Sequence, residues 1–243
     1  MCARLFARSV QITFASYNIR KAIGLDRRRN PDRILAVLKE IDADVVALQE
    51  ADRRFGARAS VLPLAAIDEH THYRPVQLGG RPDSIGWHGN AVLVRRDISV
   101  DAAEAVALPT LEPRGAVRVD LRVAGRAVRL VGMHLDLSGL RRRQQVRAVL
   151  HHLAGQMPEC PTVLLGDMNE WSRHGGCFRE FAHGWRLLAP GRSFPSRRPV
   201  AQLDRIVISP EWQVEQAGVH HSALASVGSD HLPVFARLNL PKI

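Results

Sequence analysis

The chain has 243 residues, of which 46% are hydrophobic and 24% charged, as in a globular protein that buries a sizeable core. Its three cysteines stand in no metal-binding spacing, which argues against a disulfide framework or a zinc site and favours a reduced, cytoplasmic location. The net charge of +10 favours a polyanionic partner, either nucleic acid or an anionic lipid surface, although 31 of the 34 basic residues are arginine, a bias that codon usage also produces. No stretch approaches the roughly 20 apolar residues of a membrane span, and no signal peptide is predicted.

The first 50 residues predict a strand, a helix and a second strand. Residues 10–17 alternate between apolar and polar and end at Asn18. A helix is expected from Asn30 as N-cap, because proline and an acid follow it in the first turn. Residues 45–49 form an apolar run that ends at Glu50. This strand, helix, strand order favours an α/β fold.

The rest of the chain is richer in strands than in helices. Residues 51–72 are ambiguous and predict at most a short helix around 62–67. The other predicted elements are strands at 73–77, 91–95, 99–108, 116–123, 127–134, 161–167, 203–209, 212–219 and 233–240, a helix at 141–154 and a surface loop at 190–199. No change of composition marks a linker, so residues 1–243 are expected to form a single domain.

Polar residues follow several of these strands where each strand ends. They are Asn18, Glu50, His134, Asp167, Asn169 and Asp204, together with Asp230 and His231 in the run Ser-Asp-His-Leu-Pro. Any one of them has a plainer explanation, because a strand-end acid or amide is usually a turn former and a lone histidine is more often structural. As a set at strand ends, they favour one shared crevice.

The chemistry of this set indicates phosphate chemistry with a hard cation. Carboxylate and amide oxygens without a thiolate suit Mg²⁺, with Mn²⁺ as an alternative. His231 is the candidate base, because imidazole titrates near neutrality, and Asp204 is the acid expected to orient it. The arrangement follows the logic of a hydrolytic triad with water in place of serine.

At this point the residues resemble the endonuclease/exonuclease/phosphatase superfamily, whose fold is a DNase I-like, four-layered α/β/β/α sandwich of two packed mixed sheets. The resemblance runs from residue 16 to residue 234 and rests on seven segments in order: Ser16-Tyr17-Asn18-Ile19, Leu48-Gln49-Glu50, Gly89-Asn90-Ala91-Val92-Leu93, His134-Leu135, Gly166-Asp167-Met168-Asn169, Leu203-Asp204-Arg205-Ile206 and Ser229-Asp230-His231-Leu232-Pro233. It implies a metal-dependent hydrolase that cleaves P–O bonds.

The resemblance also implies a role for each matching position. Glu50 would be the main metal ligand, with Asn18 and Asp230 close to the ion. Asp167 would align or deprotonate the attacking water, and Asp204 with His231 would form the acid and base dyad. The remaining roles are a phosphate-oxygen contact for Asn169, a contact to the phosphate or leaving oxygen for His134, support from Asn90, and helix positioning for Arg142 and Gln145.

Two arginines depart from the common family pattern. Arg20 and Arg205 stand where histidine and an aromatic residue are frequent, and both are expected to flank the substrate phosphate, as is Lys21. The expected activity is that of a nuclease-like phosphodiesterase. The alternatives are hydrolysis of phospholipid headgroups, as by a phospholipase C or a sphingomyelinase, and a catalytically silent polyanion-binding protein.

Overall fold

The computed structural model describes residues 9–53, 56, 58–78, 83–110, 114–181 and 184–241. Within these ranges the strands form two mixed sheets. The first has the order β12 (Gln213–Val219), β13 (Val234–Leu240), β1 (Val10–Asn18), β2 (Val45–Gln49), β5 (Asn90–Arg95) and β3 (Tyr73–Pro75), with β4 (Gly86–Trp87) also paired to β5. The second has the order β10 (Arg186–Leu188), β11 (Asp204–Ile208), β9 (Thr162–Asp167), β8 (Arg126–His134), β7 (Ala116–Val123) and β6 (Ser99–Val106).

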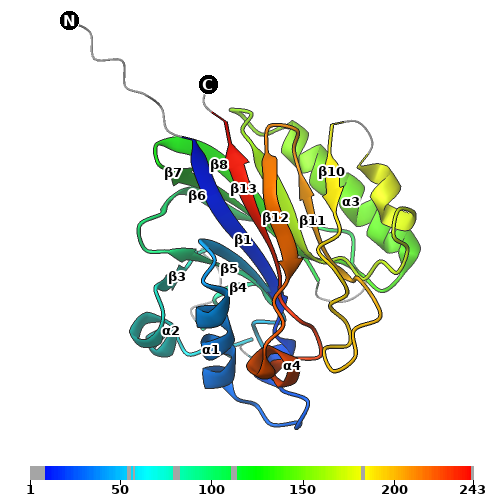
Figure 1. Cartoon of the computed structure of the whole chain (residues 1–243). Coiled ribbons are helices and arrows are strands. Elements are labelled where there is room, and N and C mark those ends of the chain that lie inside the picture. The colour runs from blue at the N-terminus through cyan, green and yellow to red at the C-terminus, as the bar shows by residue number, and fades with distance from the viewer. Residues whose placement is uncertain are drawn as a thin grey trace, which may run out of the picture.

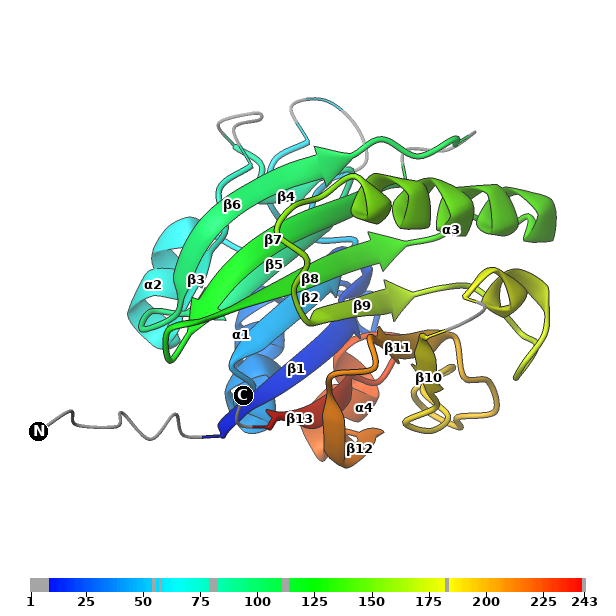
Figure 2. The ribbon, with the colours of Figure 1, turned by 90° about the horizontal axis from the view of Figure 1, so that it is seen from above.

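Helices cover the outer face of each sheet. Helices α1 (Pro31–Ile41), α2 (Leu64–His70) and α4 (Ala223–Gly228) lie on the first sheet, and α3 (Gly139–Ala154) with the 3₁₀ helix η2 (Gly176–Glu180) lies on the second. Figure 1 shows α1, α2 and α4 on one side of the molecule and α3 on the other, and Figure 2 shows the two sheets between them. The predicted four-layered sandwich is therefore confirmed.

Three apolar clusters hold these layers together. One fills the space between the sheets, and it includes residues of β1, β8 and β13. A second joins the first sheet to α1, and a third joins the second sheet to α3. Among the described residues, no helix has both the length and the apolar character to cross a bilayer.

Local sequence signals explain where the long elements begin and end. The Asn30 side chain accepts a hydrogen bond from Arg33 N at 3.0 Å, which caps α1 as predicted, and the helix ends at Asp42 in the left-handed conformation (φ 48°). The short helix expected at 62–67 begins two residues later and extends to His70. The sequence did not predict the short elements, which lack a periodic pattern. These are the 3₁₀ helix η1 (Arg20–Ala22), η2, β4, β10 and α4.

The segment 190–199 is not a simple surface loop, and that prediction was wrong for its middle. Ser193 and Ser196 are fully buried. Ser193 Oγ donates to Asp204 Oδ2 at 2.5 Å, and Ser196 Oγ donates to the carbonyl of Ser229 at 2.6 Å. The hydroxyl groups anchor the segment to the structure because each finds a buried acceptor.

The strand registers bring the predicted polar residues to one edge of the sandwich. Strands β1 and β2 are parallel and pair Asn18 with Gln49, next to Glu50. Strands β8 and β9 are parallel and pair His134 with Asp167, and the antiparallel strand β11 pairs Asp204 with Asp167. Five strand ends from the two sheets, those of β1, β2, β8, β9 and β11, therefore open toward a common space.

Candidate active site

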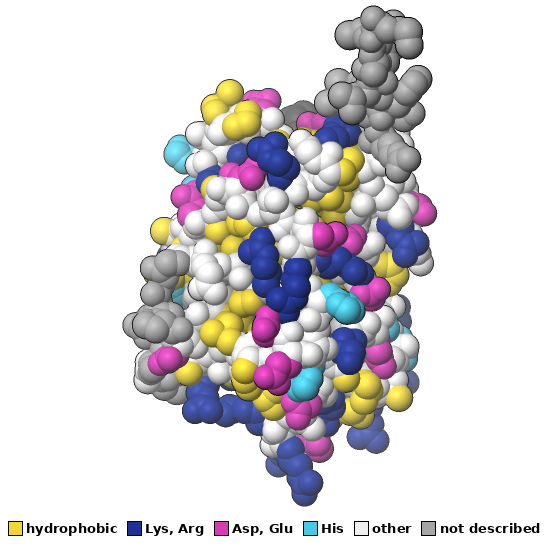
Figure 3. All heavy atoms as spheres, turned by 90° about the vertical axis from the view of Figure 1, so that its left-hand side faces the viewer, with side chains coloured by type: hydrophobic (Ala, Val, Ile, Leu, Met, Phe, Trp, Pro, Cys, Tyr) yellow, Lys and Arg dark blue, Asp and Glu magenta, His cyan; other side chains and the backbone are white. Residues whose placement is uncertain are grey.

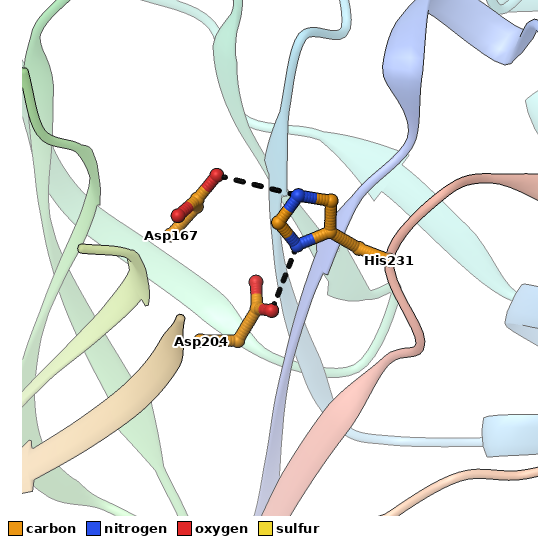
Figure 4. A group of neighbouring side chains, drawn as sticks. All are labelled: Asp167, Asp204 and His231. Atoms are coloured by element: carbon orange, nitrogen blue, oxygen red, sulfur yellow. Dashed lines mark hydrogen bonds and ion pairs between the residues drawn. The ribbon is translucent and has the colours of Figure 1, made fainter. Parts of the chain in front are cut away.

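His231 lies between two buried carboxylates. Its Nδ1 is 2.9 Å from Asp204 Oδ2, and its Nε2 is 3.7 Å from Asp167 Oδ2. Figure 4 shows the imidazole edge-on to both acids, which come from different strands. The ligand atoms of the three residues lie within 4.8 Å of one another, so the structure brings together three of the side chains that the sequence analysis singled out.

The segment before β11 supports this group from behind. Ser193 donates its hydroxyl to Asp204, and its carbonyl accepts a hydrogen bond from Leu232 N at 2.8 Å. The ring of Phe194 packs on the imidazole of His231 with centroids 4.8 Å apart. Sequence reasoning missed both residues, since neither belongs to a recognisable motif.

Asp167 is contacted from three directions. Asn18 Nδ2 donates to Oδ2 at 3.0 Å, and the backbone N–H of Asn169 donates to Oδ1 at 3.0 Å. His134 Nε2 is 3.4 Å from the same Oδ2. The Asn169 side chain instead donates to the carbonyl of Leu135 at 3.0 Å, so it fixes the turn that follows β8.

These contacts shift the pKa values of the buried groups in opposite directions. Burial raises the pKa of Asp167, but the charges of His231 and His134 and the hydrogen bond from Asn18 hold it well below its ordinary value. Burial lowers the pKa of His231, but Asp204 and Asp167 more than offset this and raise it to about 10. Without a bound cation, the group is an imidazolium between two carboxylates.

Glu50 and Asp230 lie beside Asn18, and each faces a basic side chain. Lys21 Nζ pairs with Glu50 Oε2, and Arg20 Nε lies 3.3 Å from Asp230 Oδ2. Burial raises the pKa of Glu50, but His134 and Lys21 lower it below its ordinary value. Arg20 N also donates to Asn18 Oδ1 at 3.1 Å.

The donor set therefore fits a hard divalent cation. Glu50 and Asp230 supply carboxylate oxygens and Asn18 an amide oxygen, and each carboxylate already lies against a cationic side chain. The cluster of Asp167, Asp204 and His231 also has ligand spacing, but Asp204 is already bonded to His231 and to Ser193. In that cluster His231 already contacts both carboxylates, whereas the Glu50 side chain remains partly open to solvent.

Asn90 lies at the edge of the group, and Arg205 lies outside it. Asn90 Nδ2 donates to the carbonyl of Trp87 at 3.3 Å, and its buried Oδ1 has no described partner, so it could serve a ligand. Arg205 follows Asp204 on β11 and points to the opposite face, where its guanidinium lies 5.3 Å from the ring centroid of Phe178. The expectation that Arg205 flanks the phosphate was therefore wrong, because alternation along the strand turns it away.

Two further residues position the elements around the site. Arg142 donates to the carbonyl of Leu137 at 2.6 Å and pairs with Glu170 at 3.2 Å, and Gln145 Oε1 accepts from Asp136 N at 2.8 Å. Both anchor α3, as the sequence suggested. Arg114, which was not predicted, contacts His134 Nε2 and donates to the carbonyl of Leu135 at 2.8 Å.

Comparison with known proteins gives the family. The model of the Endonuclease/Exonuclease/phosphatase family matches residues 15–231, which includes every residue described above as part of the site. The chain belongs to this family. Members of this family are hydrolases that act on phosphoester bonds.

Relatives within and around the family agree with the fold. The uncharacterized protein YbhP of Escherichia coli K12 is 30% identical over 176 residues, which cover 64% of this chain and 64% of the relative. A family protein from Bacteroides thetaiotaomicron has a TM-score of 0.77 at 19% identity, covering 96% of this chain and 99% of its own.

Two other family neighbours have named activities or ligands. D. rerio TDP2 in complex with a single-strand DNA product has a TM-score of 0.74 at 16% identity, over 94% of this chain and 99% of its own. A mannosyl-6-phosphatase of Bacteroides thetaiotaomicron has a TM-score of 0.73 at 20% identity, over 93% of this chain and 99% of its own. At this level of identity, these likenesses describe the fold.

Proposed function

We propose that this family member is a phosphodiesterase that depends on Mg²⁺, or on Mn²⁺, and hydrolyses a P–O bond with an activated water. The observation that carries the proposal is the His231 imidazole between Asp204 and Asp167, beside the carboxylates of Glu50 and Asp230. Attack by water on phosphorus requires a proton acceptor and a compensating positive charge in one place. The proposed roles follow from the contacts of each residue.

The water proton would pass to Nε2 of His231, while Asp204 keeps Nδ1 protonated and holds the ring in place. Asp167 Oδ2, which lies 3.7 Å from Nε2, would accept the second hydrogen of the same water and orient it. Asn18 and His134 fix the Asp167 carboxylate for that task. His134 also has Arg114 against its Nε2, so both can face negative charge on the phosphate.

Glu50, Asp230 and Asn18 would hold the cation. When bound there, a divalent cation neutralises a phosphate oxygen and lowers the pKa of His231, because a nearby positive charge disfavours the imidazolium. Lys21 and Arg20 would then leave the two carboxylates and turn toward the phosphate, a role compatible with their partial exposure. Asn90 would support the site through its unpaired buried oxygen.

The hydrolysis test uses bis-p-nitrophenyl phosphate with Mg²⁺ or Mn²⁺. Asp167→Ala and His231→Ala are each expected to lower kcat by about 10² to 10⁴-fold, the range of a general acid or base. His152→Ala is the matched control, because its imidazole pairs with Glu104 on the surface of the second sheet. Polyanion binding with no turnover at all would favour the silent binding protein, whereas turnover that survives both site substitutions would contradict the roles proposed for Asp167 and His231.

A substrate panel assigns the substrate class. Nucleic acid is supported by the net charge and by the DNA product named for the TDP2 neighbour, and a sugar phosphate by the mannosyl-6-phosphatase neighbour. The panel therefore compares plasmid, abasic duplex, RNA, mannose 6-phosphate, and sphingomyelin and phosphatidylglycerol vesicles. If nucleic acid is the substrate, its affinity should fall steeply with salt, since phosphate contacts release counterions.

A further inference from the structure

Several highly exposed apolar side chains among the described residues lie on segments around the site. Among the large hydrophobic residues that the structure describes, five are more than half exposed. Met157 follows the far end of α3, whereas the other four, with exposures of 57 to 67%, lie on segments that border the site. These four form the apolar rim: Leu137, Leu140, Trp171 and Val200.

Direct contacts connect the apolar rim to the site residues. Trp171 comes two residues after Asn169, and its ring packs edge-on against Phe194, which packs against His231. Val200 N donates to the carbonyl of Phe194 at 2.8 Å. The Arg142 guanidinium donates to both the carbonyl of Leu137 and the carboxylate of Glu170. It therefore holds the segment that carries Leu137 against the segment that carries Trp171.

The exposed charged side chains on the segments that carry the apolar rim are all positive. Segments 135–140, 168–175 and 190–202 contain two acids, Asp136 and Glu170, and both are buried. Four of their arginines are exposed and form no ion pair within the described part of the chain: Arg173, Arg192, Arg197 and Arg198.

A second basic loop lies at the same end of the sandwich. Residues 27–29 are three exposed arginines in the loop between η1 and α1. Figure 3 shows basic side chains protruding at the lower end of the molecule, where Figure 1 places this loop. The mouth of the site is therefore bordered by aliphatic, aromatic and cationic groups.

We propose that the apolar rim and its arginines dock the protein on the surface of an anionic phospholipid bilayer. The inference rests on the proposed phosphodiesterase and deepens it, because docking by the rim points the site at the phosphodiester of a lipid headgroup. Leucine and tryptophan partition into the interfacial region of a bilayer, and arginine is attracted to its anionic surface. Exposed apolar groups that lie on neighbouring segments are typical of an interaction site.

A nucleic-acid strand fits the rim less well. The arginines and Trp171 suit phosphates and bases, since any base can stack on an indole ring. Leu137, Leu140 and Val200 offer no ring for stacking and no polar group for a base edge. Their exposure has a physical reason at a bilayer and none along a nucleic-acid strand.

Co-sedimentation with phosphatidylcholine vesicles, with and without phosphatidylglycerol, tests the docking without turnover. The full chain should bind the mixed vesicles, and a Leu137→Gln/Leu140→Gln double variant should bind them at least about tenfold more weakly. Met157→Gln is the matched control and should bind as the parent does, since Met157 is even more exposed but lies away from the rim. Brominated lipid should quench the emission of the parent more than that of a Trp171→Phe variant.

Each other outcome overturns the inference. The rim is not a membrane-binding surface if the parent fails to sediment with the vesicles, or if the control variant loses as much binding as the double variant. It is also not one if the two leucines are needed for binding single-stranded oligonucleotide but not for binding lipid. Failure of the proposed function is separate, because it would appear as absent hydrolysis of bis-p-nitrophenyl phosphate while vesicle binding persists.

Discussion

At the scale of the residue, the ionised group at His231 is the feature with the largest electrostatic consequence. Asp204 and Asp167 flank the ring, and burial removes the water that would otherwise screen them. A general base in this position is useful only when it is neutral. A cation held by Glu50 is therefore a requirement of the proposed chemistry, because it opposes the two carboxylates that keep His231 protonated.

The same group predicts how stability depends on pH in the metal-free protein. The pKa of His231 rises from 6.5 to about 10 on folding, so the stabilisation that it provides is complete below pH 6.5 and is lost as the pH rises through 10. Urea unfolding in chelator should show that the parent is more stable than a His231→Gln variant at pH 6.5, with the difference shrinking toward pH 10. A difference that stays constant over this range would contradict the assigned charge state.

Most of the site residues could be predicted, because each one ends or begins an apolar strand and the family pattern fixes their order. Asp167, Asp204 and His231 are examples, and the structure brings their side chains together. Ser193 and Phe194 could not be predicted, since their importance comes from the way the loop before β11 folds back onto Asp204 and His231. Their positions depend on tertiary packing and not on any local pattern.

At the scale of the element, the long helices and the buried strands were predicted and the short pieces were not. Helix α1 has a cap, an N-terminal proline and an apolar face, so three independent signals agree on it. Helix α4 has six residues, and its signal is a single Ser222 cap that resembles many turns. Arg205 illustrates a different error, because the family pattern gave its position on β11 but not the face to which it points.

Gly166 tests the pairing of β8 with β9 that aligns His134 and Asp167. A Cβ at Gly166 would lie 1.8 Å from the carbonyl oxygen of Met133 on the paired strand, so the two strands must separate to admit it. Gly166→Ala is expected to lower the free energy of unfolding by about 3 kcal/mol, at the upper end of overpacking effects, and to reduce hydrolysis because Asp167 is the next residue.

Gly155→Ala is the control for this substitution. A Cβ there would meet its nearest described atom, the carbonyl oxygen of His152, at 3.7 Å, which is ordinary contact. Equal unfolding free energies for Gly166→Ala and the parent in urea titrations would show that β8 and β9 are not paired as described.

At the scale of the whole molecule, one apolar core joins the two sheets and the site lies where their strand ends meet. The core between the sheets contains Val10 near the start of the chain and Leu240 near its end. We therefore expect residues 9–241 to unfold as one cooperative unit. Circular dichroism in the far and near ultraviolet should give coincident urea transitions, whereas two separated transitions would show that the sheets belong to independent domains.

The fold could be predicted more fully than the substrate, and the reason is physical. The apolar patterns predict an α/β fold and most of its strands, and the family resemblance, whose motifs span the chain, implies the four layers. The same motifs would contact the phosphate and not the group attached to it. The apolar rim was not predicted from the sequence, because the residues around Leu137 and Trp171 form no pattern that indicates whether these side chains are buried or exposed. The exposure of these two side chains depends on how the turns that carry them pack in the folded protein.

The central claim is that a divalent cation held by Glu50 makes His231 and Asp167 competent to activate water. The most direct measurement follows hydrolysis of bis-p-nitrophenyl phosphate while Mn²⁺ is titrated into the chelator-treated parent and into a Glu50→Gln variant. The account predicts no turnover before Mn²⁺ is added, saturation in the parent, and a Mn²⁺ requirement raised by about tenfold or more in the variant. Turnover without any divalent ion, or identical titrations of the two proteins, would contradict it.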